Sequence, residues 1–252
     1  MEKFGNSKVA AMIFAAGLGT RLYPLTKDKP KALVEINGQP LLQTVIEKII
    51  AAGITEIVVN VHHFSQLVKD YLASHSFEAN IQISDETDCL LDTGGGLKFA
   101  EQLLKTADHV LLHNVDILSN IDLNKLIINH IENGALATLA VKERPTSRYL
   151  IFDKKTLQLC GWENVKTGES LESRWTDNPA KLAFSGIHVV SKEIFPLIPS
   201  GKKISMTPLY VEMAKTQNIR GYLHQHDQWL DVGKYEDVMR LGEGRSKFVD
   251  RS

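Results

Sequence analysis

The sequence predicts an α/β protein built on a doubly wound sheet, and three observations support this fold class. Apolar strand-like runs alternate with amphipathic helical segments in the first half of the chain, as expected for parallel strands joined by crossover helices. A glycine-rich segment directly follows the first run, and polar residues follow later runs. Because ligands of such sheets bind beyond the carboxyl ends of the strands, these segments are the first candidates for a functional site.

The elements of the first half follow one another in a regular order. The run from Val9 to Phe14 indicates a buried strand, because it is apolar and is followed by glycine. Pro40 begins a helix whose apolar residues share one face, and Gly53 ends it. The further predicted elements are strands at 56–61, 80–84 and 109–113 and helices at 65–72 and 95–104. This order predicts a Rossmann-like mixed sheet in a three-layer α/β/α arrangement.

The second half has weaker signals. The polar segment 163–181 indicates a surface loop or hairpin beside the binding pocket. A short apolar strand is expected to end at Leu230, and the charged tail 243–252 is expected to be a frayed terminus. The remaining predicted elements are strands at 136–141, 149–152 and 182–190 and helices at 207–216 and 234–241.

Composition excludes several classes of function. The chain has 252 residues and a formal net charge of -1, so it carries no sign of nucleic acid binding. No apolar run reaches the length of a membrane span or forms the core of a signal peptide. Cys89 and Cys160 indicate neither a metal knuckle nor a disulfide framework. We expect one domain over residues 1–252, located in the cytoplasm, as a monomer or small homo-oligomer.

Two histidine pairs could suggest a metal site, but the sequence favours ordinary roles for them. His62 and His63 are adjacent on a predicted strand end, so their side chains point apart. His224 and His226 share one face of a strand-like run, which we expect to be an exposed strand edge.

The most informative segment is residues 14–33, FAAGLGTRLYPLTKDKPKAL. Gly17 and Gly19 allow the backbone to come close to a ligand, so that successive amides can converge on phosphate oxygens. Arg21 adds a planar charged fork and Lys31 a mobile point charge. The segment matches neither G-x-G-x-x-G nor a P-loop, which argues against a dehydrogenase and a P-loop ATPase.

The whole pattern, G-x-G-T-R-x-x-P-x-T followed by P-K-x-L, resembles the signature of the sugar-1-phosphate nucleotidyltransferases, or sugar-nucleotide pyrophosphorylases. The matching residues are Gly17, Gly19, Thr20, Arg21, Pro24, Thr26, Pro30, Lys31 and Leu33. The resemblance implies a nucleoside triphosphate and a sugar 1-phosphate as substrates and Mg²⁺ as cofactor. It makes Arg21 and Lys31 candidate catalytic residues. It also assigns nucleotide binding to Ala15, Ala16, Gly17, Gly19, Thr20 and Arg21.

The segment LLDTGGGL at 90–97 is the second informative feature. Three successive glycines are costly in a helix, so they indicate either a flexible turn or a flat backbone surface for a base or sugar. The resemblance implies that this turn borders the nucleotide, with Asp92, Thr93, Gly94 and Gly95 as candidates. The D-T-G-G-G form is particularly similar to uridylyltransferases that act on N-acetylmuramic acid 1-phosphate.

Two aspartates follow apolar runs in distant parts of the chain. Asp116 ends the run HVLLHNVD, and Asp231 lies in WLDVG. From position alone, Asp116 could be a turn residue or a hard oxygen ligand for a cation, and Asp231 could cap a helix. The resemblance implies that both aspartates bind Mg²⁺.

A third motif is FSGIHVV at 184–190, a strand with a small residue pair near its start. The glycine indicates either a bulge or a place where a ligand approaches the backbone closely. By the resemblance, Ser185 and Gly186 would lie against the sugar, and Asn114 would join them.

These motifs together predict Mg²⁺-dependent nucleotidyl transfer, with a nucleotide-binding half at 8–120 and a sugar-binding, metal-completing half at 121–245. The first choice of substrates is UTP and N-acetylmuramic acid 1-phosphate. Alternatives are a mannose-1-phosphate guanylyltransferase, a phosphocholine cytidylyltransferase, and a catalytically silent regulator that binds a nucleotide sugar. No hexapeptide repeat is present, so we expect no C-terminal β-helix domain.

Overall fold

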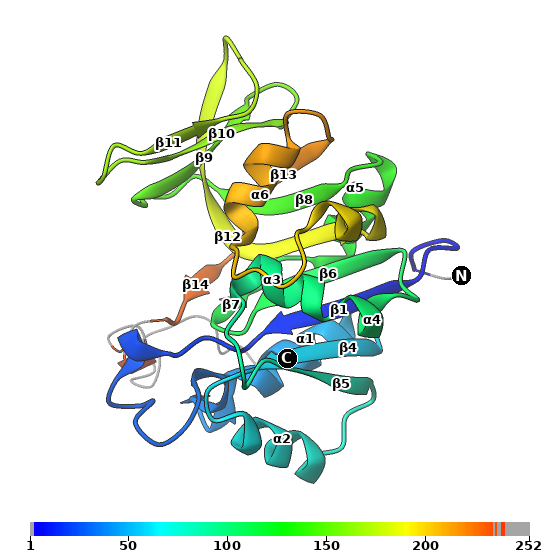
Figure 1. Cartoon of the computed structure of the whole chain (residues 1–252), viewed down its shortest axis with the longest axis vertical. Helices are drawn as coiled ribbons and strands as arrows, with labels where there is room; N and C mark the ends of the chain where they lie inside the picture. Colours follow the sequence, from blue (N-terminus) through cyan, green and yellow to red (C-terminus); the bar gives the residue numbers. More distant parts are fainter. Residues whose placement is uncertain (1–2, 234, 236–237, 240–252) are drawn as a thin grey trace.

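The computed structural model describes residues 3–233, 235, 238 and 239, and these form one central ten-stranded sheet with helices on both faces (Figure 1). The predicted helix at 234–241 and the tail at 243–252 lie wholly or mostly outside the described residues. Among the described residues, no helix combines the length and the apolar character needed to cross a membrane.

The main path of the sheet follows the order β11, β10, β9, β12, β6, β1, β4, β5. Off this path, β8 pairs with β12, and β13 pairs with β8. The strands of this sheet are β1 (Val9–Phe14), β4 (Glu56–Val61), β5 (Asn80–Asp85), β6 (His109–Asn114), β8 (Ala137–Lys142), β9 (Arg148–Asp153), β10 (Leu159–Asn164), β11 (Ser170–Glu172), β12 (Pro179–Ser191) and β13 (Ile219–Leu223). Two small antiparallel pairs stand apart, β2 (Glu35–Ile36) with β3 (Gln39–Pro40) and β7 (Ile117–Ser119) with β14 (Trp229–Asp231).

The helices pack on the two faces of the sheet as the alternation of apolar residues in β1 requires. Ala11 and Ile13 face one core, to which α1, α2 and α5 contribute, and Met12 and Phe14 face the other, to which α3, α4 and α6 contribute. The helices are α1 (Leu41–Ala51), α2 (Ser65–Ser74), α3 (Asp92–Phe99), α4 (Glu101–Leu104), α5 (Leu123–Glu132) and α6 (Met206–Met213). The three-layer α/β/α class predicted from the sequence is therefore confirmed.

The parallel strands bring several polar residues to one edge of the sheet. β1 pairs in parallel with β4 and β6, and Phe14 lies opposite both Asn60 and Asn114. β5 pairs in parallel with β4 and ends at Asp85. The loop after β1 therefore lies beside the carboxyl ends of its two neighbours, where ligands of such sheets bind.

The pair formed by β7 and β14 closes the same edge. Asp231 lies opposite Ile117 in this antiparallel pair, and the Val232 amide donates a hydrogen bond to the Asp116 carbonyl at 2.9 Å. Two segments more than a hundred residues apart in sequence are thus held side by side.

The helix predicted at 95–104 differs from the structure. It begins three residues earlier, at Asp92, and it is divided at Ala100 into α3 and α4. The glycines therefore lie inside α3 and not at its start. Their lack of side chains serves close packing: a Cβ atom on Gly94 would lie 2.9 Å from the Ile204 carbonyl oxygen, and one on Gly95 would collide with the Lys202 carbonyl.

The polar segment 163–181 forms a hairpin, as one of the two sequence interpretations predicts. β10 and β11 form this hairpin, and β12 starts at Pro179, three residues before the predicted strand. Figure 1 shows β9, β10 and β11 at one end of the molecule and β5 with α2 at the other.

Buried histidines in the core should make the fold sensitive to acid. Burial lowers the pKa of His113, His130 and His188 each to about 3, from an ordinary value of 6.5. Between these values the unfolded chain binds more protons than the folded chain, so the free energy of unfolding falls as the pH falls through this window. Each histidine should contribute roughly 1 kcal/mol per pH unit there.

Urea denaturation at pH 7.5, 6 and 5 measures this dependence. We expect a steep loss of stability below pH 6.5, and a shallower one in His188→Gln, which keeps a hydrogen-bonding group near the Tyr210 hydroxyl. A stability that is constant from pH 7.5 to 5 would contradict the burial of these side chains in a neutral form.

Candidate active site

The loop after β1 folds back over Lys31. Gly19 adopts a left-handed conformation with φ +66°, which a glycine accommodates without strain, and the Thr26 hydroxyl donates to its carbonyl at 2.9 Å. A 3-10 turn at Thr20–Leu22 then carries Arg21, and a second at Lys31–Leu33 carries Lys31. Both cations of the predicted phosphate-binding segment therefore have defined backbone positions.

Four charged side chains converge at the edge formed by β6, β7 and β14. The Lys31 ammonium lies 2.7 Å from Asp116 Oδ2. Gly233 is the centre of the remaining contacts, because a Cβ atom there would lie 2.6 Å from Asp231 Oδ1 and 2.8 Å from Arg21 Nη2. It would also lie 3.1 Å from Asp116 Oδ2. The structure thus brings together the predicted catalytic pair and the predicted metal-binding pair.

The negative charge of Asp116 disfavours the charged form of Asp231. Asp116 is buried, with 6% of its surface exposed, and burial followed by the negative charge of Asp116 raises the pKa of Asp231. The Gly233 amide, which donates to Asp231 Oδ1 at 2.8 Å, and the cations Arg21 and Lys31 act in the opposite direction. Burial and the neighbouring carboxylate therefore make the charged form of Asp231 less favourable than it is in water.

These groups fit a hard divalent cation. The donors are carboxylate oxygens, and the missing side chain of Gly233 leaves a cradle that any Cβ atom would fill. Within the part of the chain that the structure describes, no three or more His, Cys, Asp or Glu side chains group around one point. An ion here would take two ligands from Asp116 and Asp231 and the others from water and substrate oxygens.

A cavity of about 280 Å³ lies between the loop after β1 and the start of α3. The four charged side chains do not line it, but Gly17 does, and a Cβ atom on Gly17 would lie 3.7 Å from Lys31 Nζ. It joins two predicted nucleotide-binding motifs that are far apart in sequence, since Ala16 and Gly17 lie on one side and Asp92 and Thr93 on the other. Its lining residues are Phe14, Ala16, Gly17, Asn60, Glu86, Leu90, Asp92, Thr93 and Lys203. The sequence analysis did not identify Asn60, Glu86 or Lys203.

Several predicted nucleotide-binding amides already have partners within the protein. The amides of Gly94 and Gly95 donate to the Ile204 carbonyl at 2.8 and 3.1 Å. Those of Ala15 and Ala16 donate to Asn60 Oδ1 at 2.7 and 3.2 Å. These four amides are therefore engaged in internal hydrogen bonds, and of the four residues Ala16 lines the cavity.

The predicted sugar-binding strand contains a bulge. The register between β12 and β8 shifts between Phe184 and His188, and Gly186 has φ +73°. A Cβ atom on Gly186 would lie 2.9 Å from Asn114 Nδ2, so only glycine fits against this amide. The bulge interpretation of Gly186 is therefore confirmed, and Gly186 and Asn114 lie in contact.

The prediction for His224 is wrong. His224 is 3% exposed and follows the end of β13, and its Nε2 is 2.7 Å from the hydroxyl of the fully buried Ser185. Burial, followed by the charges of Lys142 and Arg144, lowers the pKa of His224 to about 4. The His224 side chain therefore supports the β12 bulge through Ser185.

Arg144 is a further candidate that the sequence analysis missed. Its Nη2 donates to the Phe184 carbonyl at 2.8 Å, and its guanidinium lies 4.0 Å from the centre of the Trp229 ring. Burial lowers the pKa of Arg144, while the charge of Asp231 raises it. Arg144 lies two residues after the end of β8, just as Asp116 lies two residues after the end of β6. This position in the sequence could have identified Arg144 as a candidate.

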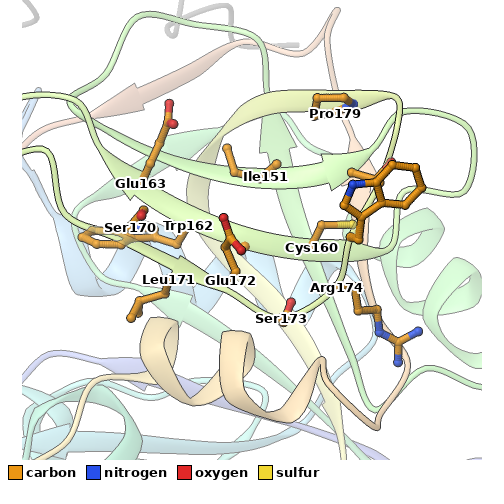
Figure 2. A pocket seen from close by; sticks show the side chains of 13 residues that line it. Ile151, Cys160, Trp162, Glu163, Ser170, Leu171, Glu172, Ser173, Arg174 and Pro179 are labelled. Carbon is orange, nitrogen blue, oxygen red and sulfur yellow. The ribbon is translucent and has the colours of Figure 1, made fainter.

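A second cavity, of about 330 Å³, lies on the outer face of the hairpin region (Figure 2). Ile151, Cys160 and Glu172 line it, together with Trp175, which is 86% exposed. None of the predicted site residues lines this cavity.

Fold and site together define an α/β protein whose strand ends gather two carboxylates, an arginine and a lysine beside a cavity. The chain matches the nucleotidyl transferase family over residues 10–245. It is 33% identical over 233 residues to an N-acetylmuramate alpha-1-phosphate uridylyltransferase from Caulobacter vibrioides, covering 88% of this chain and 91% of that protein. The chain therefore belongs to the nucleotidyl transferase family, as its motifs predict.

Other relatives differ in substrate. A mannose-1-phosphate guanyltransferase from Gibberella zeae is 29% identical over 239 residues, which cover 90% of this chain and 62% of that protein. The crystal structure of a putative glucose-1-phosphate thymidylyltransferase from Bacillus anthracis superposes with a TM-score of 0.78 at 17% identity, covering 97% of each chain. The fold and enzyme class are thus shared among proteins named for different nucleotides and sugars.

Because Asp116 disfavours the charge of Asp231, one substitution should affect stability and activity in opposite directions. Asp231→Asn keeps an oxygen for the Gly233 amide but removes a charge that the fold disfavours, so its thermal midpoint at pH 7.5 should equal or exceed that of the wild type. Pyrophosphate release should nevertheless fall by about 100-fold or more, because the expected cation would lose one of its two protein ligands.

Asp153→Asn is the matched control. Hydrogen bonds from Thr176 and Thr156 lower the pKa of Asp153 to about 2, so loss of this charge should lower the thermal midpoint and leave activity intact. A destabilised Asp231→Asn with normal turnover would contradict the assignment of the site.

Proposed function

We propose that this protein transfers a uridylyl group from UTP to N-acetylmuramic acid 1-phosphate and releases pyrophosphate, with Mg²⁺ as cofactor. The observation that carries the proposal is the convergence of Arg21, Lys31, Asp116 and Asp231 beside the cavity between the two nucleotide motifs. The choice of substrates is supported by the name of the Caulobacter vibrioides relative and by the D-T-G-G-G motif.

The reaction itself sets what the residues must do. An oxygen of the sugar 1-phosphate attacks the α-phosphorus of UTP and forms a new phosphorus–oxygen bond. The bond between the α-phosphorus and the bridging oxygen breaks, and pyrophosphate leaves with the electron pair. Because the attacking phosphate is already an anion, no general base is needed. The protein has to bring negative groups together and stabilise the charge that develops.

The charged residues suit these tasks. Arg21, which is exposed beside the glycine loop, would bind the β- and γ-phosphates through its planar fork. Lys31, which reaches Asp116 at 2.7 Å, would neutralise charge at the α-phosphate. Asp116 and Asp231 would hold Mg²⁺, which when bound neutralises negative charge on the phosphate oxygens of the substrates.

The opposite side of the site suits the sugar phosphate. Gly186 and Asn114 form a narrow wall next to Asp116, and Ser185 fixes this wall through His224. Arg144 provides a further cation near Asp231 for the second phosphate group. On this proposal residues 8–120 bind the nucleotide and residues 121–245 bind the sugar and complete the metal site.

Guanylyl transfer to mannose 1-phosphate is a second candidate, favoured by the Gibberella zeae relative. Both candidates use the same charged residues and differ only in the base and sugar. The charged residues therefore support nucleotidyl transfer without determining which substrate pair is used.

A pyrophosphate-release assay with Mg²⁺ tests the proposal by crossing UTP and GTP with the 1-phosphates of N-acetylmuramic acid, mannose and glucose. We expect strong release with UTP and N-acetylmuramic acid 1-phosphate. Release with another pair would keep the reaction class and overturn the substrate assignment. No release with any pair would overturn the proposed activity.

Lys31→Ala tests the central cation. We expect kcat to fall by about 100-fold or more, because charge at the α-phosphate loses its partner in the transition state. Lys29→Ala is a matched control, since Lys29 lies on the same segment and its side chain is 41% exposed, 3.9 Å from Glu35. Circular dichroism checks that both variants fold. Turnover in Lys31→Ala within twofold of the Lys29→Ala value would refute the role of Lys31.

A further inference from the structure

We propose that Asn60 and Glu86 form a buried strut that joins the two walls of the nucleotide cavity and positions the glycine loop for the triphosphate. Both are positioning residues that act through the backbone amides they hold. The inference rests on the proposed function, because that function makes this cavity the nucleotide site.

The first link of the strut is to the loop after β1. Asn60 lies on β4 opposite Phe14 and is 2% exposed. Its Oδ1 accepts hydrogen bonds from two successive amides, those of Ala15 at 2.7 Å and Ala16 at 3.2 Å. This one oxygen therefore fixes the direction in which the backbone leaves β1 and enters the glycine loop.

The second link is from Asn60 to Glu86. Asn60 Nδ2 donates to Glu86 Oε1 at 2.7 Å, and Glu86 is also 2% exposed. Because the amide oxygen of Asn60 faces two donors, its NH₂ group must face an acceptor. The orientation of the Asn60 amide is thus determined on both sides.

The third link is from Glu86 to the other wall. Glu86 Oε2 accepts from the Leu91 amide at 3.2 Å, directly before Asp92 and the start of α3. The backbone of Glu86 is held as well, by the Val61 carbonyl at 2.8 Å and by His62 Nδ1 at 2.6 Å. Four side-chain hydrogen bonds therefore run without interruption from Ala15 to Leu91.

The third glycine of the D-T-G-G-G motif fits against this strut. A Cβ atom on Gly96 would lie 2.5 Å from Glu86 Oε1 and 3.1 Å from Asn60 Nδ2. Helix α3 can rest on the two side chains only because Gly96 has none. This contact explains why residue 96 is a glycine. Neither a flexible turn nor a flat surface for the base explains it.

The strut can be broken and rebuilt without changing its size. Asn60→Asp places an oxygen opposite Glu86 Oε1, so that two acceptors face each other. Glu86→Gln leaves one acceptor oxygen for two donors, which are Asn60 Nδ2 and the Leu91 amide. In the double variant, the carboxylate at position 60 accepts from the amides of Ala15 and Ala16 and from the side-chain NH₂ group at position 86. The side-chain carbonyl at position 86 accepts from the Leu91 amide. All four hydrogen bonds return, and the net charge equals that of the wild type.

We expect each single variant to raise the KM for the nucleoside triphosphate about tenfold, with the KM for the sugar 1-phosphate within about twofold, and the double variant to restore the wild-type value. A purely structural role would lower the thermal midpoint without this selective change in KM. An unchanged nucleotide KM in both single variants, or a raised KM in a folded double variant, would overturn the proposal. The double variant decides the outcome even where a single variant fails to fold.

The exposed pair of Asn80 and Glu56 provides the matched control. It joins the same two strands through an Asn Nδ2 to Glu Oε2 hydrogen bond of 2.8 Å, at the other end of the sheet. The variants Asn80→Asp and Glu56→Gln should leave the nucleotide KM unchanged. A similar rise in these controls would show that the effect does not belong to the cavity and would overturn the proposal.

Amide hydrogen exchange separates this inference from the proposed function, because it needs no substrate. The amides of Ala15, Ala16 and Leu91 should exchange slowly in the wild type and the double variant and faster in each folded single variant. Fast exchange of Ala15 and Ala16 in the wild type would overturn the strut. An inactive wild type with this exchange pattern would refute only the proposed activity.

Discussion

The site depends on one electrostatic constraint, which is that two carboxylates are held next to each other at a mostly buried sheet edge. The antiparallel pair of β7 and β14 imposes it, since Asp231 lies opposite Ile117 and the Val232 amide binds the Asp116 carbonyl. Burial and the negative charge of Asp116 raise the pKa of Asp231, whereas nearby cations lower it. Lys31 and Arg21 provide that compensation from the loop after β1, which explains why the loop folds back toward these strands.

The sheet supplies the remaining geometry. The parallel strands β1, β4 and β6 end at the same edge, so the glycine loop, Asn60 and Asn114 become neighbours. The long strand β12 then crosses this edge antiparallel to β6 and bulges at Gly186, which puts a wall beside Asn114. A site where two cations meet two carboxylates suits a reaction that must unite two phosphorylated, negatively charged substrates.

The sequence was sufficient for features that depend on local pattern. β1, α1, β4 and α2 follow from hydrophobic periodicity, and the charged residues of the site follow from motifs directly after apolar runs. The resemblance to a family supplied roles for these residues, and the family itself is confirmed. The roles stay predictions, although the structure places their side chains within a few ångströms of one another.

Features that depend on distant partners could not be predicted in this way. Asn60 is one polar residue within an apolar strand, and only the fold shows that its partners are the amides of Ala15 and Ala16. His224 was misassigned because exposure after a strand end depends on where the chain turns. The glycines of α3 suggested a ligand surface, whereas their close neighbours include the backbone of residues 202–204. In each case the missing information is tertiary packing, which local periodicity does not contain.

A crystal structure with Mg²⁺ and a non-hydrolysable UTP analogue would test the central claim most directly. We expect the metal ion between Asp116 and Asp231, the triphosphate along residues 15–21 with Arg21, and the uridine in the cavity lined by Asn60, Glu86 and Thr93. A triphosphate bound elsewhere, for example in the hairpin cavity of Figure 2, or an ion that contacts neither aspartate, would contradict it.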